Sequence, residues 1–152
     1  MTKDVLISIK GLQFDTSAEP HQDEVELIVA GQYHKKGDTI YLMYQEAMDG
    51  GEPDTKNTIK INGERVELSK KGRVSTSMLF IEGQKNISTY RTPFGNMVIG
   101  VDTADIKIEE DEDSVKLNIL YYLDLNYDLF AECNLKLEAR SKETGGAFFA
   151  ST

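Results

Sequence analysis

Hydrophobic and polar residues alternate with a period of two along most of this chain. The alternation is regular over residues 5–9, 25–33 and 115–123. Because successive side chains of a strand point to opposite faces, this spacing predicts strands that share one apolar wall. Further runs with the same period occupy residues 40–44, 58–62, 66–68, 74–80, 87–91, 97–103, 106–108 and 129–139.

Turn-forming residues separate these runs at short intervals. Gly37, Asn62-Gly63, Gly72 and Gly83 each follow an alternating run, and Asn-Gly predicts a type I′ hairpin turn. Such short connections leave no room for crossover helices, so the pattern predicts an all-β, antiparallel up-and-down meander. A meander of about eight to ten strands either splits into a sandwich or closes into a barrel, and periodicity alone does not choose between them.

Two places break the regular pattern. The apolar phase of residues 97–103 differs from that of 106–108, which predicts a bulge or bend near 102–105. Residues 123–137 also fit a helical stripe, but strict alternation on both sides of Asn126 and Asp128 favours two strands. In the second strand, Leu129 and Cys133 are expected on the same inward phase.

The length of 152 residues fits one domain, predicted over 1–140 with a C-terminal tail over 141–152. No apolar run approaches the roughly 20 residues that span a bilayer, and the first residues do not resemble a signal peptide. A cytoplasmic location is therefore the default expectation. The single cysteine, Cys133, is expected to be a small buried apolar side chain.

The formal net charge of −9 argues against nucleic acids and anionic membranes as partners. The acidic run 109–113 lacks the ligand spacing of a calcium loop and is expected at a hairpin tip. His21 and His34 are the only histidines, and no motif indicates a metal, a cofactor or a catalytic nucleophile.

Polar and aromatic residues also occur on phases that otherwise hold apolar ones. Arg91 on an inward phase would need a carboxylate partner, and Glu46 is the expected one. Strand ends that meet water are the alternative explanation. The candidate ligand-binding residues are Tyr33, Tyr44, Glu46, Thr89, Arg91 and Tyr121, and Thr76 shares their inward phase.

The stretch Tyr90–Met97, YRTPFGNM, combines turn-forming residues with an arginine. Pro93 presets φ, and Gly95 tolerates positive φ, so residues 92–96 are predicted to form a hairpin connection.

This stretch and GQYHKKGDTIYLMYQE (31–46) together resemble the YwiB-like family of uncharacterised bacterial proteins. The resemblance spans roughly residues 3–139. It implies a lipocalin-like (calycin) β-barrel rather than a sandwich, and it implies no activity. Lipocalins carry a Gly-x-Trp near the first strand, whereas this chain has Gly11-Leu12-Gln13 and no tryptophan.

Three functional hypotheses follow. The first is a non-enzymatic barrel that binds a small ligand at its mouth. The second is a protein-interaction module, with a homodimer as one form of it, suggested by apolar residues on outward phases. The third is an enzyme that uses Glu46, Arg91 and the tyrosines as acid–base or anion-holding groups. The apolar outward residues are Leu6, Ile28, Met43, Leu79 and Ile81.

Overall fold

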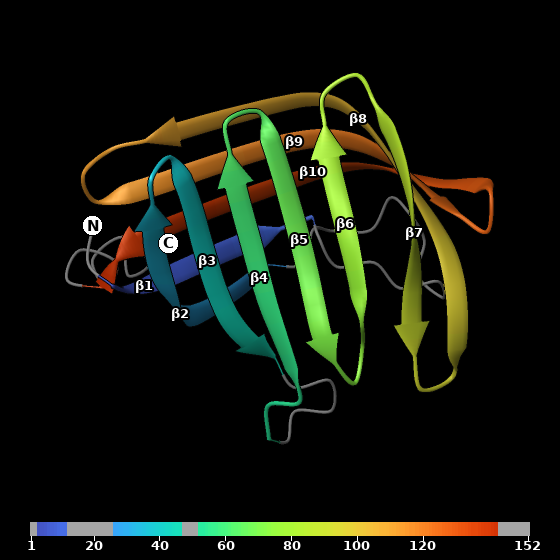
Figure 1. Cartoon of the computed structure of the whole chain (residues 1–152), viewed down its shortest axis with the longest axis horizontal. Coiled ribbons are helices and arrows are strands. Elements are labelled where there is room, and N and C mark those ends of the chain that lie inside the picture. The colour runs from blue at the N-terminus through green and yellow to red at the C-terminus, as the bar shows by residue number, and fades with distance from the viewer. Residues whose placement is uncertain (1–2, 12–25, 47–51, 143–152) are drawn as a thin grey trace.

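The computed structural model describes residues 3–11, 26–46 and 52–142, which form ten strands (Figure 1). The strands are β1 (Asp4–Lys10), β2 (Glu26–Lys36), β3 (Thr39–Glu46), β4 (Thr55–Asn62), β5 (Arg65–Gly72), β6 (Thr76–Ile81), β7 (Lys85–Thr92), β8 (Gly95–Glu110), β9 (Ser114–Leu125) and β10 (Asp128–Ser141).

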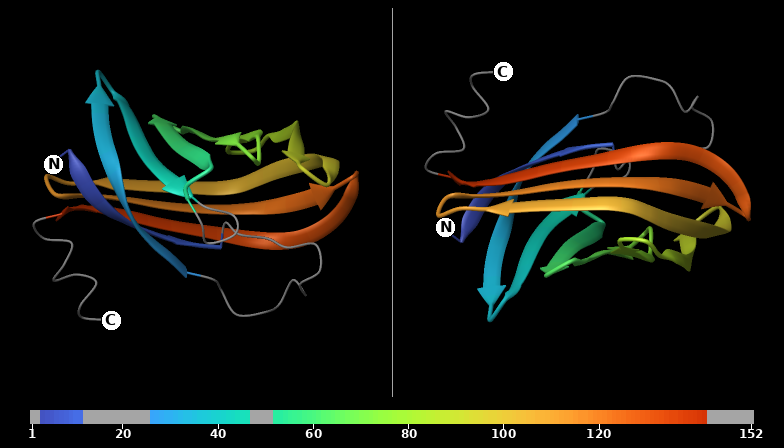
Figure 2. Two further views of the ribbon diagram at one scale, coloured as in Figure 1. Left: turned by 90° about the horizontal axis from the view of Figure 1, so that it is seen from below. Right: turned by 90° about the horizontal axis from the view of Figure 1, so that it is seen from above.

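The strands form one antiparallel sheet that curls into a barrel. Each strand pairs with the next one in sequence except β6 with β7, and β1 pairs with β10 through six residue pairs from Val5–Ser141 to Lys10–Lys136. The long strands β8, β9 and β10 lie behind β3–β6 and cross them steeply (Figures 1 and 2). The predicted all-β meander and its closure into a barrel are confirmed.

The barrel has one seam, between β6 and β7. These strands are the two ends of the sheet order, although they are consecutive in sequence. Ser75 and Arg91 form a single bridge there, with backbone N···O distances of 3.0 and 2.9 Å. Between this bridge and the turn after Ile81, the two strands have no ladder of paired residues. The barrel is therefore nearly, but not completely, closed.

Apolar side chains fill the middle of the barrel. Tyr121 and Phe80 lie at its centre, with ring centroids 5.0 Å apart in an edge-to-face arrangement. Residues of the predicted inward phases, such as Ile7, Leu42 and Ile119, are fully buried around them. The alternation in the sequence thus identifies the core wall on most strands.

The bulge predicted near residues 102–105 is confirmed, because the β8–β9 register shifts between Thr103 and Asp105. The expected inward position of Leu129 is wrong. A register shift between Leu129 and Ala131 leaves Leu129 71% exposed and packs Phe130 against the core. An extra residue reverses the phase of everything before it on the strand.

The hairpin after β4 turns one residue later than predicted. Asn62 pairs with Arg65, so the two-residue loop is Gly63-Glu64. Of these two loop residues, only Gly63 has a positive φ, at 61°. A positive φ at the first loop position alone is the pattern of a type II′ turn rather than type I′. The type I′ pattern occurs instead at Asn126-Tyr127, where φ is 49° and 71°.

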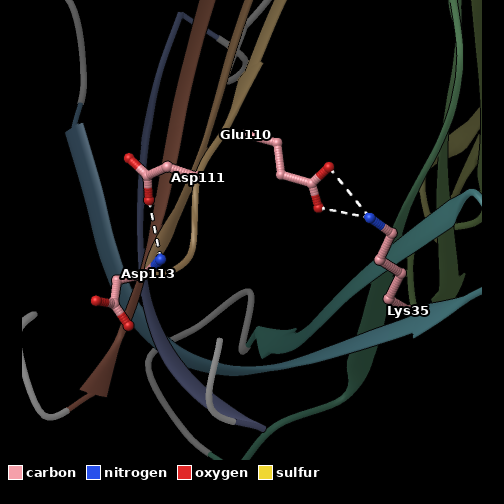
Figure 3. A network of polar contacts seen from close by, with 4 residues as sticks. All are labelled: Lys35, Glu110, Asp111 and Asp113. Carbon is pink, nitrogen blue, oxygen red and sulfur yellow. Dashed lines mark hydrogen bonds and ion pairs between the residues drawn. The ribbon is translucent and has the colours of Figure 1, made fainter.

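The acidic run lies exposed at the β8–β9 hairpin tip, as expected. Asp111 accepts hydrogen bonds from the Asp113 amide and the Ser114 hydroxyl, both at 2.9 Å, which order the turn. Glu110 reaches across to Lys35 of the β2–β3 hairpin, with Nζ 3.0 and 3.2 Å from its two carboxylate oxygens (Figure 3).

The last strand extends to Ser141, one residue beyond the predicted domain limit, and Ser141 is buried. The predicted tail beyond residue 142 lies outside the described residues, as does His21.

Candidate functional site

A row of polar side chains faces the lumen at one end of the barrel. Tyr44 on β3 pairs in register with Asn57 on β4, Asn57 with Lys70 on β5, and Lys70 with Thr76 on β6. The Ser75–Arg91 bridge places Tyr90 opposite Thr76 across the seam. We call Tyr44, Asn57, Lys70, Thr76, Tyr90 and the adjoining Glu46 the polar end. Cross-strand neighbours lie about 5 Å apart, so these groups are contiguous.

Glu46 and Lys70 form the charged centre of the polar end. Lys70 Nζ lies 2.9 Å from Glu46 Oε1, and the same oxygen accepts a 3.3 Å hydrogen bond from Asn57 Nδ2. The side chain of Lys70 is 12% exposed and that of Glu46 is 21% exposed, so the pair is largely shielded yet still reached by solvent. Removing one partner would leave the other charge unpaired in a poorly solvated place, which is costly.

Two side-chain oxygens of the polar end are buried without a hydrogen-bond partner among the described residues. They are Asn57 Oδ1 and Thr76 Oγ1, on side chains that are 0% and 8% exposed. Leaving such a group unsatisfied costs about 1–3 kcal/mol. Each therefore offers a hydrogen bond that a molecule entering this end of the barrel could complete.

The two tyrosines of the polar end remain protonated at neutral pH. Burial raises the pKa of Tyr44 strongly, and the nearby Glu46 carboxylate raises it further. The same two causes, in the same order, raise the pKa of Tyr90. With neutral phenols and a closed ion pair, the polar end offers hydrogen bonds and carries little net charge.

An outer groove lies on the other side of the sheet and touches one residue of the polar end, Tyr44. It has a volume of about 440 Å³ and also touches Gly31. A side chain at Gly31 would meet Met43 O and Ile7 Cδ1, both at 2.6 Å. Gly31 thus leaves no room for a side chain between β2 and β3. The groove is also lined by Asp4, Val5, Ala30, Gln32, Met43, Gln45, Lys56 and Lys142.

The predicted site residues do not converge on one place. Tyr44 and Glu46 belong to the polar end, whereas Tyr121 lies in the apolar centre and Tyr33 near the opposite hairpin tips. Burial raises the pKa of Tyr33, with a smaller contribution from Glu110, which binds the nearby Lys35. The hydroxyl of Tyr121 is buried, and among the described residues its only hydrogen-bonding neighbour is the Cys133 thiol, a weak partner.

The predicted inward phase of β7 is wrong. Thr89 and Arg91 are exposed on the outside, and Ile87 beside them is 60% exposed, whereas Tyr90 packs against the core. The Arg91–Glu46 pair is therefore not formed, and Lys70 takes the expected place of Arg91. The physical reason is that the larger apolar surface of Tyr90 is buried while the Arg91 charge stays in water.

Sequence reasoning missed Asn57, Lys70 and Tyr90. Asn57 and Lys70 alternate in phase with Ile59, Ile61, Val66 and Leu68, which are buried. Their shared phase with the buried residues could have identified them, because each of the two strands continues its apolar inward face with one polar residue. Tyr90 gave no such signal, since the apolar Ile87 lies on the opposite phase.

Neither Cys133 nor His34 lies in a setting that would make its side chain reactive. Cys133 packs against the core, and burial is the largest cause that raises the pKa of its thiol, so it is a poor nucleophile at neutral pH. His34 is exposed, with its ring 6.3 Å from that of Tyr41. Among the described residues, no helix is long and apolar enough to cross a membrane.

Comparison with known proteins agrees with this architecture. The family model for a domain of unknown function, DUF1934, matches residues 7–137, which covers all ten strands except the ends of β1 and β10. The chain belongs to the DUF1934 family.

One curated relative of this DUF1934 chain is the uncharacterised β-barrel protein YwiB of Bacillus subtilis (strain 168). The two are 28% identical over 101 residues, which is 66% of this chain and 70% of YwiB. The crystal structure of the B. subtilis ywiB protein superposes with a TM-score of 0.75 at 23% identity, over 91% of this chain and 92% of that one. The expected YwiB-like resemblance is confirmed, and the lipocalin-like character stays a prediction.

Proposed function

We propose that this DUF1934 protein binds a small polar molecule at the polar end of its barrel without transforming it. The observation that carries the proposal is the pair of buried, unpartnered oxygens, Asn57 Oδ1 and Thr76 Oγ1, beside a closed ion pair. A ligand with a hydrogen-bond donor for Asn57 and a hydroxyl or amide for Thr76 would satisfy both.

The size and charge of the ligand are limited by the surroundings. Apolar side chains fill the middle of the barrel, so the ligand would lie at the end and not deep in the lumen. Glu46 and Lys70 neutralise one another, which favours a neutral or zwitterionic molecule over an ion. Asn57 and Thr76 lie two strands apart, about 10 Å along the sheet, which suits a molecule the size of a sugar or a nucleoside.

A binding role fits these groups better than catalysis. The polar end holds phenols whose pKa is raised and a carboxylate already bound to Lys70, so it has neither an activated nucleophile nor a free base.

The test is an NMR titration of the full chain with a panel of neutral sugars, polyols, nucleosides and zwitterionic amino acids. We expect at least one compound to shift the Asn57 side-chain amide and the Thr76 methyl saturably. Thr76→Val should weaken that binding at least about tenfold. The matched control is Thr103→Val, which removes a buried, unpartnered hydroxyl from the centre of the barrel. Equal weakening in both variants, or shifts confined to other residues, would contradict the proposal.

A second candidate function, self-association, has its own observation. Ile87 and Leu129 are 60% and 71% exposed on one outer row of β7–β10, and they flank the Lys85–Asp124 ion pair. A patch with both charges and apolar flanks can complement its own copy across a two-fold axis. Sedimentation should show a dimer that Leu129→Lys converts to a monomer, and a concentration-independent monomer would reject this candidate.

A further inference from the structure

The outer surface of β1, β8, β9 and β10 carries a cationic groove. It has a volume of about 380 Å³ and is lined by four lysines together with Ser8, Glu26, Glu109, Leu117, Asn118, Leu137 and Glu138. We call Lys10, Lys107, Lys116 and Lys136, with the surface between them, the lysine groove. It lies on the outer face of the sheet, whereas the polar end faces the lumen.

The lysines follow the register of the sheet. Lys10 pairs with Lys136, Lys136 with Asn118, and Asn118 with Lys107, so three lysines share one row across four strands. Lys116 is two residues from Asn118 on β9, on the same face. At a strand spacing of about 4.8 Å, Lys10 and Lys136 are close enough for one small ligand to contact both, whereas Lys107 lies about 10 Å from Lys136.

The pairing of Lys10 with Lys136 places two like charges opposite each other, and Glu26, which pairs with Lys10 on its other side, compensates only one of them. Like charges directly opposite each other on neighbouring strands repel, whereas opposite charges attract. On the next row of the same face, Lys116 lies between Glu138 and Glu109, which is the favourable arrangement. An anion bound in the groove would relieve the repulsion between Lys10 and Lys136.

The acids of the groove do not neutralise all of its lysines. Glu26 binds Lys10 at 3.1 Å, and Glu138 binds Arg140 at 2.6 Å. Lys107 reaches Asp105 only at 4.0 Å, and Lys136 forms no ion pair with any described residue. In a chain with a net charge of −9, this leaves a locally cationic surface.

We propose that the lysine groove binds a small polyanion of the phosphate class, with Lys136 and Lys10 as its main contacts. Lysine ammonium groups bind phosphate oxygens as point charges, and neighbouring lysines suit a ligand with two adjacent negative groups. This inference is independent of the polar end, because the two sites share no residue and lie on opposite faces of the sheet.

The experiment is a calorimetric titration of the full chain with inorganic pyrophosphate at low ionic strength. We expect saturable binding with one site per chain, and at least fivefold weaker binding in Lys136→Gln and in Lys10→Gln. Lys71→Gln is the matched control, since Lys71 also opposes a lysine, Lys56, but lies outside the groove. It should bind within twofold of the wild type.

Three results would overturn the proposal. One is the absence of saturable binding by the wild-type chain. Another is equal weakening by Lys71→Gln, which would mean that only the overall charge matters. The third is full affinity in Lys136→Gln. Sulfate at matched ionic strength should compete weakly, because it carries one anionic centre where pyrophosphate carries two.

Discussion

At the scale of single residues, the main departure from an ordinary barrel core is a set of buried hydroxyl groups that have no partner, or only a weak one, in the described part of the chain. Thr76 belongs to the polar end, but Thr103 and Tyr121 lie among apolar side chains, 1% exposed each. They are paired in register on β8 and β9, and Tyr121 also pairs with Cys133 on β10. Polar groups in such places lower stability unless they are satisfied.

Tyr121→Phe should therefore stabilise the protein. The substitution keeps the ring that packs edge-to-face on Phe80 and removes only the buried hydroxyl, whose one neighbour, the Cys133 thiol, is a weak hydrogen-bonding group. We expect the free energy of unfolding to rise by about 1 kcal/mol, measured by urea denaturation. A loss of 1 kcal/mol or more would mean that the hydroxyl is satisfied in solution. Phe80→Leu is the control, because it loses apolar contacts and should destabilise.

The strands and their register were largely predictable, because one face of each strand is buried and the alternation records it. The bulge near Thr103 was predictable for the same reason, since the phase of apolar residues changes there. The phase of β7 was not predictable from the sequence. The apolar Ile87 lies on the outside, whereas the inward positions before Tyr90 hold the short polar side chains Asn86 and Ser88. Only part of the polar end was predictable from the sequence, because identifying Asn57 and Lys70 as neighbours of Glu46 requires the register across three strands.

At the scale of the strands, Gly31 is the residue that allows β2 and β3 to pack closely. Its φ is not in the left-handed region, so its role is space: an added Cβ would lie 2.6 Å from the Met43 carbonyl oxygen. Backbone cannot yield as a flexible side chain does.

Gly31→Ala should separate β2 from β3 and destabilise the barrel by about 2 kcal/mol, as overpacking does. The midpoint of urea unfolding measures this change. Ala30→Ser, at the neighbouring exposed position, should change the stability by less than about 0.5 kcal/mol. A neutral Gly31→Ala variant would show that the close approach of the strands is not required.

The whole molecule protects several phenols from ionisation. Burial is the largest cause that raises the pKa of Tyr44, Tyr90 and Tyr121. In the unfolded chain these groups ionise near pH 10. A folded pKa above the unfolded value means that the stabilisation is complete below about pH 10 and is lost as the pH rises further.

An ultraviolet titration of the seven tyrosines should accordingly show two phases. The second phase should coincide with the loss of the circular dichroism signal and should contain Tyr44, Tyr121 and the half-buried Tyr90, whose pKa values burial raises. Tyr121→Phe should reduce the amplitude of the second phase by about a third and leave the first unchanged. Ionisation of all seven in one phase, before any unfolding, would contradict the burial of these residues.

Native mass spectrometry tests the central claim, that the polar end holds a small molecule, most directly. The full chain would be isolated without denaturation as the wild type, Thr76→Val and Thr103→Val. We predict that the wild type and Thr103→Val carry an added mass of a few hundred daltons, on the order of a sugar or nucleoside, which Thr76→Val lacks. A bare chain mass in all three proteins, or an added mass that persists in Thr76→Val, would contradict the account.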